Sequence, residues 1–162
     1  METICLQDGE HPLLPFHQER VNRSRLALFG IKKQLRLAPF LEEQDLPISG
    51  KYKLRIHYAK EFEQFECIPY EQKTVKSLRI VEVDRFDYRF KYADRSKLAY
   101  LYGQRNGCDD ILISYRGYLT DSYYANLALY DGQKWWTPAH PLLKGVRRKA
   151  LCNCGILHPT IL

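Results

Sequence analysis

The sequence of 162 residues predicts an α+β fold with two lobes. Helical spacing of apolar residues and alternating β-prone runs occur in separate segments of the chain. Turn signals such as Asp8-Gly9 and Asn106-Gly107 divide these segments. Apolar residues make up 45% of the chain and charged residues 27%, as in ordinary globular proteins. We expect an N-terminal α+β lobe over residues 1–85 and a C-terminal lobe over residues 86–162.

The first lobe is predicted to be a helix packed against an antiparallel sheet. Glu2–Leu6 is a short β-prone run that ends at the Asp8-Gly9 turn. Helical spacing follows over residues 16–29, and Gly30 can end the helix. We expect the arginines of this helix on its polar side: Arg20, Arg23 and Arg25. The strands of the sheet are then expected at Lys51–Ala59, Glu61–Tyr70 and Ser77–Val83.

The second lobe is predicted to begin with an aromatic and basic linker and a short helix. The linker covers residues 86–93, and the helix has apolar residues at Leu98, Leu101 and Tyr102. Gly145 is expected to begin a final, basic helix. Between the two helices, strands alternate with turns, the strands at Asp110–Tyr115, Tyr118–Thr120, Ala125–Tyr130 and Lys134–Thr137.

Charge and cysteine content limit the classes of partner. Lys and Arg number 25 against 19 acidic residues, and the net charge of +6 favours anionic ligands. We find no nucleic-acid-binding motif and no long apolar run, so we expect a soluble, cytoplasmic protein that binds neither nucleic acid nor membrane. The five cysteines are an odd number without a secretory signal, which predicts reduced thiols. Cys152 and Cys154 are too close together for a zinc site, so we expect no metal.

Several short segments occur in an order typical of one enzyme family. In chain order they are ETICLQDG with HQERVNRS, then FKYADRSKL, LTDSYYANLALYDG and WTPAHPLLKGVRRKAL. This order resembles the class IV aminotransferases and 4-amino-4-deoxychorismate lyases, which depend on pyridoxal 5'-phosphate (PLP). The resemblance implies the two-lobed, D-amino acid aminotransferase-like PLP fold (fold type IV), with PLP bound by the C-terminal lobe. It also implies a homodimer.

The resemblance assigns roles to individual side chains. Lys91 corresponds to the lysine that carries the cofactor, and Lys97 is a weaker alternative. Arg20 matches the arginine that helps to bind the cofactor phosphate, and a planar guanidinium suits that task because it can donate two hydrogen bonds. Asp121 stands where the family has a glutamate that pairs with the pyridine nitrogen, and it has one methylene less reach.

The last segment resembles the turn in which backbone amides hold the cofactor phosphate. Gly145, Val146 and Arg147 correspond to this turn, and Arg147 replaces a residue that commonly has a hydroxyl. The start of a helix suits an anion because its amides have no partner within the helix and its dipole is positive there. The alternative interpretation is an ordinary capped basic helix.

The chain ends at GILHPTIL, soon after this helix, so we expect a short form of the fold, truncated at the C-terminus, with an incomplete second lobe. The predicted function is that of a PLP-dependent enzyme acting on a small amino substrate, with 4-amino-4-deoxychorismate lyase as the preferred activity. One alternative is a branched-chain or D-amino acid transaminase. Another is a non-catalytic homologue that acts as a binding protein. An unrelated basic interaction domain with accidental motif matches is a further alternative.

Overall fold

A computed structural model describes residues 1–162, which divide into two compact units, Met1–Gln72 and Lys73–Leu162. The division falls earlier than the predicted lobe boundary between residues 85 and 86. The predicted strand at Ser77–Val83 is formed, as β4 (Leu78–Val83), but it belongs to the second unit. The predicted assignment of this strand to the first lobe's sheet was wrong, because β4 pairs with β5 (Asp110–Tyr115), a strand far along the chain.

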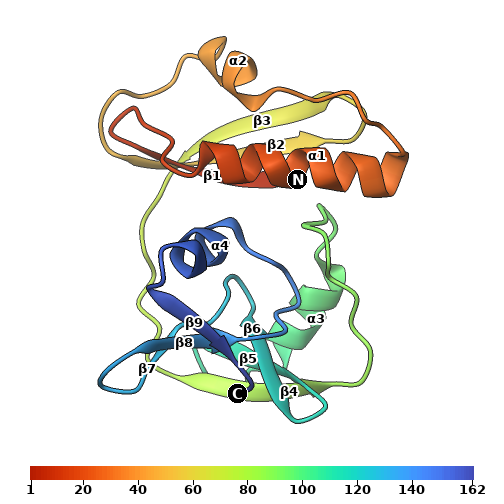
Figure 1. The fold of residues 1–162 in the computed structure, drawn as a ribbon. Helices are drawn as coiled ribbons and strands as arrows, with labels where there is room; N and C mark the ends of the chain where they lie inside the picture. Colours follow the sequence, from red (N-terminus) through yellow and green to blue (C-terminus); the bar gives the residue numbers. More distant parts are fainter. The chain divides into compact units, whose positions relative to one another are not determined.

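The first unit is a three-stranded antiparallel sheet with helices packed on its apolar side (Figure 1). The strand order is β1-β2-β3, with Ile4 opposite Leu54 in the register of β1 and β2. Isoleucine and leucine side chains of β1 and β2 form the core together with Val21 of α1 and Leu37 of α2. The elements are β1 (Glu2–Gln7), α1 (Leu14–Phe29), α2 (Leu37–Glu42), β2 (Lys51–Tyr58) and β3 (Phe62–Pro69).

Helix α1 ends where the sequence predicts, but its arginines do not lie as predicted. Gly30 follows the last turn in the left-handed conformation, with φ of 69°, which glycine adopts without strain. Arg20 and Arg25 are buried, whereas Leu26 of the expected apolar side is 50% exposed. The predicted placement of these arginines on a polar face was therefore wrong for Arg20 and Arg25. Both are tolerated inside because a carboxylate or backbone carbonyls accept their hydrogen bonds.

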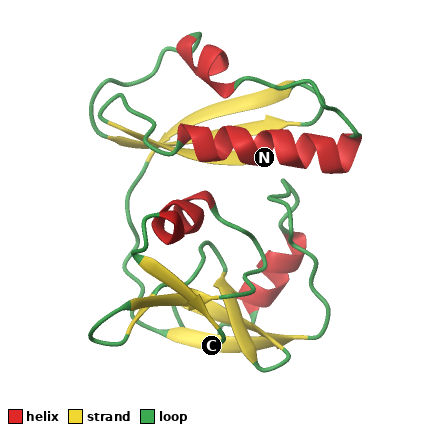
Figure 2. Cartoon of the chain, in the orientation of Figure 1, coloured by secondary structure: helices red, strands yellow, loops and turns green.

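The second unit contains two small sheets, each with a helix that connects parallel strands (Figure 2). In the first sheet, β4 runs parallel to β5, which runs antiparallel to β6, and α3 lies in the connection from β4 to β5. In the other, β8 runs antiparallel to β7 and parallel to β9, and α4 lies in the connection from β8 to β9. The remaining elements are α3 (Ser96–Gly103), β6 (Tyr118–Ser122), β7 (Leu129–Tyr130), β8 (Trp135–Pro138), α4 (Val146–Asn153) and β9 (Leu157–Thr160).

Aromatic side chains of the linker, residues 86–93, pack into the core of the second unit. Tyr88 is buried together with Val81, Leu98 and Ile113, and Phe86 and Tyr92 pack against this cluster. The linker is therefore attached to the sheet by its rings. None of the helices in the chain combines the length and apolar character needed to cross a bilayer.

Candidate active site

Lys91 lies in the linker between β4 and α3, at a tight bend of the backbone. The amide of Tyr92 donates a hydrogen bond to the carbonyl of Phe90 across Lys91, with N and O 3.0 Å apart. The Tyr92 ring lies edge-on to the rings of Tyr88 and Phe90, with centroids 6.0 and 6.1 Å apart. Lys91 itself is partly buried. The bend is thus attached to the core of the unit through Tyr92, which packs against that core.

Arg95 connects the segment of Lys91 with the segment that follows Asp121. Its Nη2 donates to the carbonyl oxygen of Tyr123 at 2.7 Å, and its guanidinium lies over the Tyr123 ring, 4.6 Å from the centroid. The Tyr123 ring is in turn stacked on Tyr102 of α3 at 4.4 Å. The Nε of Arg95 is buried and has no hydrogen-bond partner. This donor is one that a bound anionic or carbonyl-bearing molecule would satisfy.

Asp121 is buried on β6, and donors face both of its carboxylate oxygens. Oδ1 accepts a hydrogen bond from Nδ2 of Asn126 at 2.6 Å, and Oδ2 accepts one from the amide of Leu143 at 2.9 Å. Burial raises the pKa of Asp121 to about 6, although these hydrogen bonds act in the opposite direction. Each oxygen has a second lone pair, so the carboxylate can accept a further donor.

Gly145 caps α4, and the first turn of this helix is suited to an anion. The amide of Gly145 donates to Oδ1 of Asn126 at 3.2 Å, and no side chain caps the helix. Arg147 is exposed in the first turn, while Val146 is partly buried. A cation at the positive end of a helix dipole is unfavourable by itself, and a bound phosphate would reverse that effect. The uncapped amides and the basic first turn together fit a phosphate-bearing cofactor.

Arg148, the next residue of this turn, has a different task from Arg147. Its Nε donates to Oγ1 of buried Thr137 at 3.1 Å, and its Nη2 donates to the carbonyl of Pro138 at 2.8 Å. Both acceptors lie on β8. Arg148 therefore fixes the start of α4 to the sheet, whereas Arg147 remains available to a ligand.

Arg20 lies in the first unit, where Glu2 and His17 surround it. Its Nε donates to Oε1 of Glu2 at 2.8 Å, its Nη2 donates to Oε2, and Nδ1 of His17 lies 2.7 Å from Oε2. All of these side chains are buried. Arg20 is therefore not the solvated surface arginine that is common on helices. Nη1 is the nitrogen of its guanidinium that Glu2 does not use.

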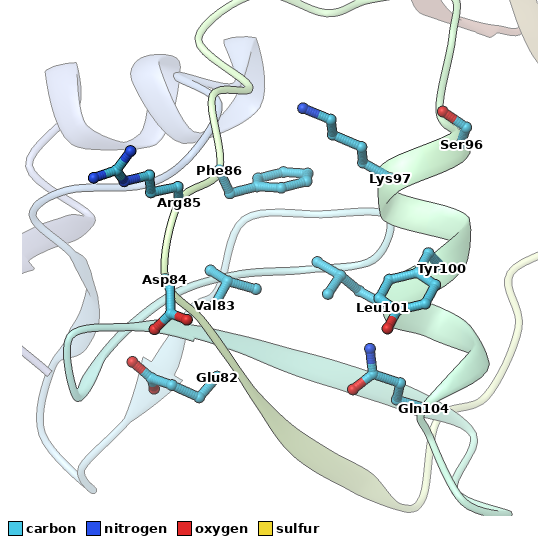
Figure 3. A pocket seen from close by; sticks show the side chains of 10 residues that line it. All are labelled: Glu82, Val83, Asp84, Arg85, Phe86, Ser96, Lys97, Tyr100, Leu101 and Gln104. Atoms are coloured by element: carbon cyan, nitrogen blue, oxygen red, sulfur yellow. The ribbon is translucent and has the colours of Figure 1, made fainter.

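A pocket of about 800 Å³ lies elsewhere in the second unit, between the end of β4 and α3 (Figure 3). Its lining includes Asp84, Arg85, Phe86, Lys97 and Tyr100. The weaker alternative, Lys97, is among these residues. None of the other predicted site residues lines it.

The structure thus brings together, within the second unit, the segments that carry Lys91, Asp121 and Gly145. The sequence-based assignment did not include Asn126, which links Asp121 to Gly145, or Arg95, which links the linker to Tyr123. A signal for both was present, because Asn126 is the asparagine of the segment that contains Asp121, and Arg95 lies in the segment that contains Lys91.

Comparison with known proteins identifies the family. The family model for amino-transferase class IV matches residues 55–158. The chain belongs to the class IV aminotransferase family. An uncharacterized protein of Haemophilus influenzae is 34% identical to this class IV chain over 157 residues, which are 95% of the chain and 83% of that protein.

Solved structures confirm fold type IV for this class IV chain. A structure of a candidate 4-amino-4-deoxychorismate lyase from Haemophilus somnus has a TM-score of 0.90 and 30% identity, and the match covers 99% of the chain and 86% of that protein. An aminotransferase from Brucella abortus bound to PLP has a TM-score of 0.79 at 19% identity, covering 99% of the chain and 70% of that protein. The similarity to the Brucella abortus structure shows the fold alone.

Proposed function

We propose that this class IV protein binds PLP through Lys91 and acts as a 4-amino-4-deoxychorismate lyase. The observation that carries the proposal is the hydrogen-bonded connection from Asp121 through Asn126 to Gly145, which links a buried carboxylate to an uncapped, basic helix start. PLP requires both features, since a carboxylate keeps its ring nitrogen protonated and an anion site holds its phosphate. The similarity to the lyase structure from Haemophilus somnus supports the choice of reaction.

Each residue has a separate task in this proposal. PLP, when bound, supplies the electron sink that stabilises negative charge at the substrate's α-carbon. The Nζ of Lys91 would hold the cofactor until the substrate amine displaces it, would then take the proton from the amino-bearing carbon, and would give a proton to the departing enolpyruvate group, which leaves as pyruvate. Asp121 orients the ring nitrogen. The amides from Gly145 to Arg147 and the side chain of Arg147 bind the phosphate.

The visible absorbance spectrum of the protein with added PLP tests this function. Borohydride reduction and peptide mapping then locate the modified lysine. We expect an adduct at Lys91 that Lys91→Ala abolishes and the matched control Lys97→Ala retains. Labelling spread over surface lysines, equal in the wild type and Lys91→Ala, would contradict the proposal.

The reaction is tested with substrates after the adduct is located. Release of pyruvate from 4-amino-4-deoxychorismate identifies the lyase, whereas consumption of 2-oxoglutarate with an amino acid identifies a transaminase. Binding of PLP without either reaction would identify a non-catalytic binding protein. Two features favour the non-catalytic binding protein as the second candidate. The side chain of Asp121 has a shorter reach than glutamate, and the bulky Tyr123 stands two residues from this carboxylate, with its ring in contact with Arg95 and Tyr102.

A further inference from the structure

Asn126 contacts both ends of the candidate cofactor site with one carboxamide group. Its Nδ2 donates to Oδ1 of Asp121 at 2.6 Å and to the carbonyl of Leu143 at 2.7 Å. Its Oδ1 accepts a hydrogen bond from the amide of Gly145 at 3.2 Å. The carboxamide therefore uses both its donor and its acceptor atoms between β6 and the turn that begins α4.

A second connection between the same segments closes a ring of hydrogen bonds. The amide of Leu143 donates to Oδ2 of Asp121 at 2.9 Å, and the Leu143 carbonyl accepts from Asn126. Asp121 and Asn126 also face each other in a β-bridge of their backbones. A displacement of the turn before α4 must consequently disturb the Asp121 carboxylate, because they share these partners.

The packing at Gly145 shows that this position of the Asn126 side chain requires glycine. A Cβ added to Gly145 would stand 2.1 Å from Oδ1 and 3.2 Å from Cγ of Asn126. Gly145 has φ of −66°, which any residue can adopt, so backbone conformation does not explain the glycine. The close approach of the Asn126 carboxamide does.

We propose that Asn126 is a positioning residue that couples the carboxylate for the cofactor ring nitrogen to the turn for the cofactor phosphate. The inference rests on the proposed function, since it concerns how the two contacts to PLP are held in one geometry. Asn126 acts through Asp121 and Gly145 and does not itself take part in the reaction. If Asn126 were purely structural, its replacement would lower the stability of the fold without changing how Asp121 titrates beside the cofactor.

Two substitutions of Asn126 remove different sets of its hydrogen bonds. Asn126→Asp keeps the shape and an oxygen for Gly145 but removes the donor to Asp121. Asn126→Ala removes every contact. Asn153→Asp, at the exposed end of α4, is the matched control for the added charge. Circular dichroism and urea unfolding report whether each variant is folded.

The readouts are the dissociation constant for PLP and the pH dependence of the bound cofactor's absorbance. We expect the dissociation constant to rise by about tenfold or more in Asn126→Asp and Asn126→Ala, as for loss of a charge-assisted hydrogen bond. The pH midpoint of the spectrum should move upward in both, because a carboxyl group that loses a donor to its ionised form holds its proton to higher pH. Asn153→Asp should change neither quantity.

The pair Asn126 and Gly145 provides a separate test that uses inorganic phosphate as well as PLP. Gly145→Ala should weaken binding of both strongly in the wild-type background. It should weaken them much less in the Asn126→Ala background, where the clashing oxygen is gone, so the two effects will not add. Effects that add would overturn the coupling.

The outcomes distinguish this inference from the function on which it rests. If the wild type forms no adduct at Lys91, the proposed function fails and the inference fails with it. If the wild type forms the adduct but folded Asn126 variants keep its affinity and its pH midpoint, the inference alone is overturned.

Discussion

Arg20 and Glu2 form a buried, bidentate ion pair between α1 and β1, with Nε of Arg20 2.8 Å from Oε1 of Glu2 and Nη2 donating to Oε2. The Nδ1 of His17 approaches the same carboxylate at 2.7 Å. Burial raises the pKa of Glu2, but hydrogen bonds from His17 and Arg20 outweigh it and hold the pKa below its ordinary value. The carboxylate therefore remains charged inside the first unit and orients the guanidinium.

Replacing this carboxylate should destabilise the protein strongly. Glu2→Gln keeps the size of the side chain but leaves the Arg20 charge buried without its counter-ion, and such a change typically costs about 3–5 kcal/mol. The free energy of unfolding in urea at neutral pH measures the cost. Glu66→Gln is the control, because it breaks the exposed pair with Arg55, 2.8 Å apart, which is worth at most about 1 kcal/mol. Equal effects of the two substitutions would contradict the buried ion pair.

Arg25 should contribute to stability through backbone carbonyls instead of a carboxylate. Its Nη1 donates to the carbonyl of Lys33 at 2.5 Å and its Nε to that of Ala59 at 3.3 Å, and Nη2 donates to the carbonyl of Lys60. Arg25→Met fills similar space but leaves these acceptors without their donor, so we expect a loss of about 2–3 kcal/mol. Arg23→Met on the exposed side of α1 should change stability by less than about 0.5 kcal/mol. Chemical unfolding compares them, and similar midpoints would show that Arg25 is dispensable.

The contribution of Asp121 to stability should depend on pH in the opposite direction from that of Glu2. Burial raises the pKa of Asp121 from 3.8 to about 6, so between these values the folded chain holds a proton that the unfolded chain has lost. The stabilisation is complete below the unfolded pKa and is lost as pH rises through about 6. It amounts to about 3 kcal/mol, since one pKa unit corresponds to about 1.4 kcal/mol.

The difference in unfolding free energy between the wild type and Asp121→Asn, measured from pH 4 to 7, isolates this contribution. The advantage of the wild type should shrink as pH rises, while titration of Glu2 and other groups cancels in the difference. Asp45→Asn, at an exposed position, is the matched control for the chemical change from a carboxyl group to an amide. A difference for Asp121→Asn that stays constant across this pH range would rule out a raised pKa of Asp121.

Local signals account for much of what the sequence predicted. The first strand, the helix that ends before Gly30 and the hairpin of β2 and β3 follow from alternation, helical spacing and turn residues within one stretch of chain. Order along the chain likewise identified the family. These signals need no information about distant partners.

The errors concern relationships between distant segments. The parallel pairing of β4 with β5 depends on a crossover through α3, which the composition of Leu78–Val83 does not reveal. Two short elements, α2 and β9, were not predicted at all, because Pro39 and Pro159 interrupt segments already short for any periodicity. The burial of Arg25 depends on carbonyls of residues 33, 59 and 60, which only the fold brings to it.

In the candidate site too, contacts between distant segments could not be predicted from the sequence. Resemblance named Asp121 and Gly145 separately, as residues for the ring and for the phosphate. That one asparagine joins them could be seen only once β6 and the start of α4 were placed side by side. Motifs identify the groups that meet a ligand more readily than the groups that hold them in place.

Arg147 and Arg148 are neighbours in the first turn of α4, and their substitution should have opposite consequences. Arg148 is bonded to Thr137 and Pro138 of β8, so Arg148→Met should lower the free energy of unfolding by about 1–3 kcal/mol. Arg147 is exposed, so Arg147→Met should leave stability within about 0.5 kcal/mol of the wild type.

Under the proposed function, Arg147→Met should nevertheless weaken PLP binding, because it removes a cation from the phosphate turn. Urea unfolding of the protein without PLP and PLP titration of the folded variants measure the two effects separately. An Arg147→Met variant that binds PLP as tightly as the wild type would remove Arg147 from the phosphate site and leave the backbone amides of the turn to hold the anion.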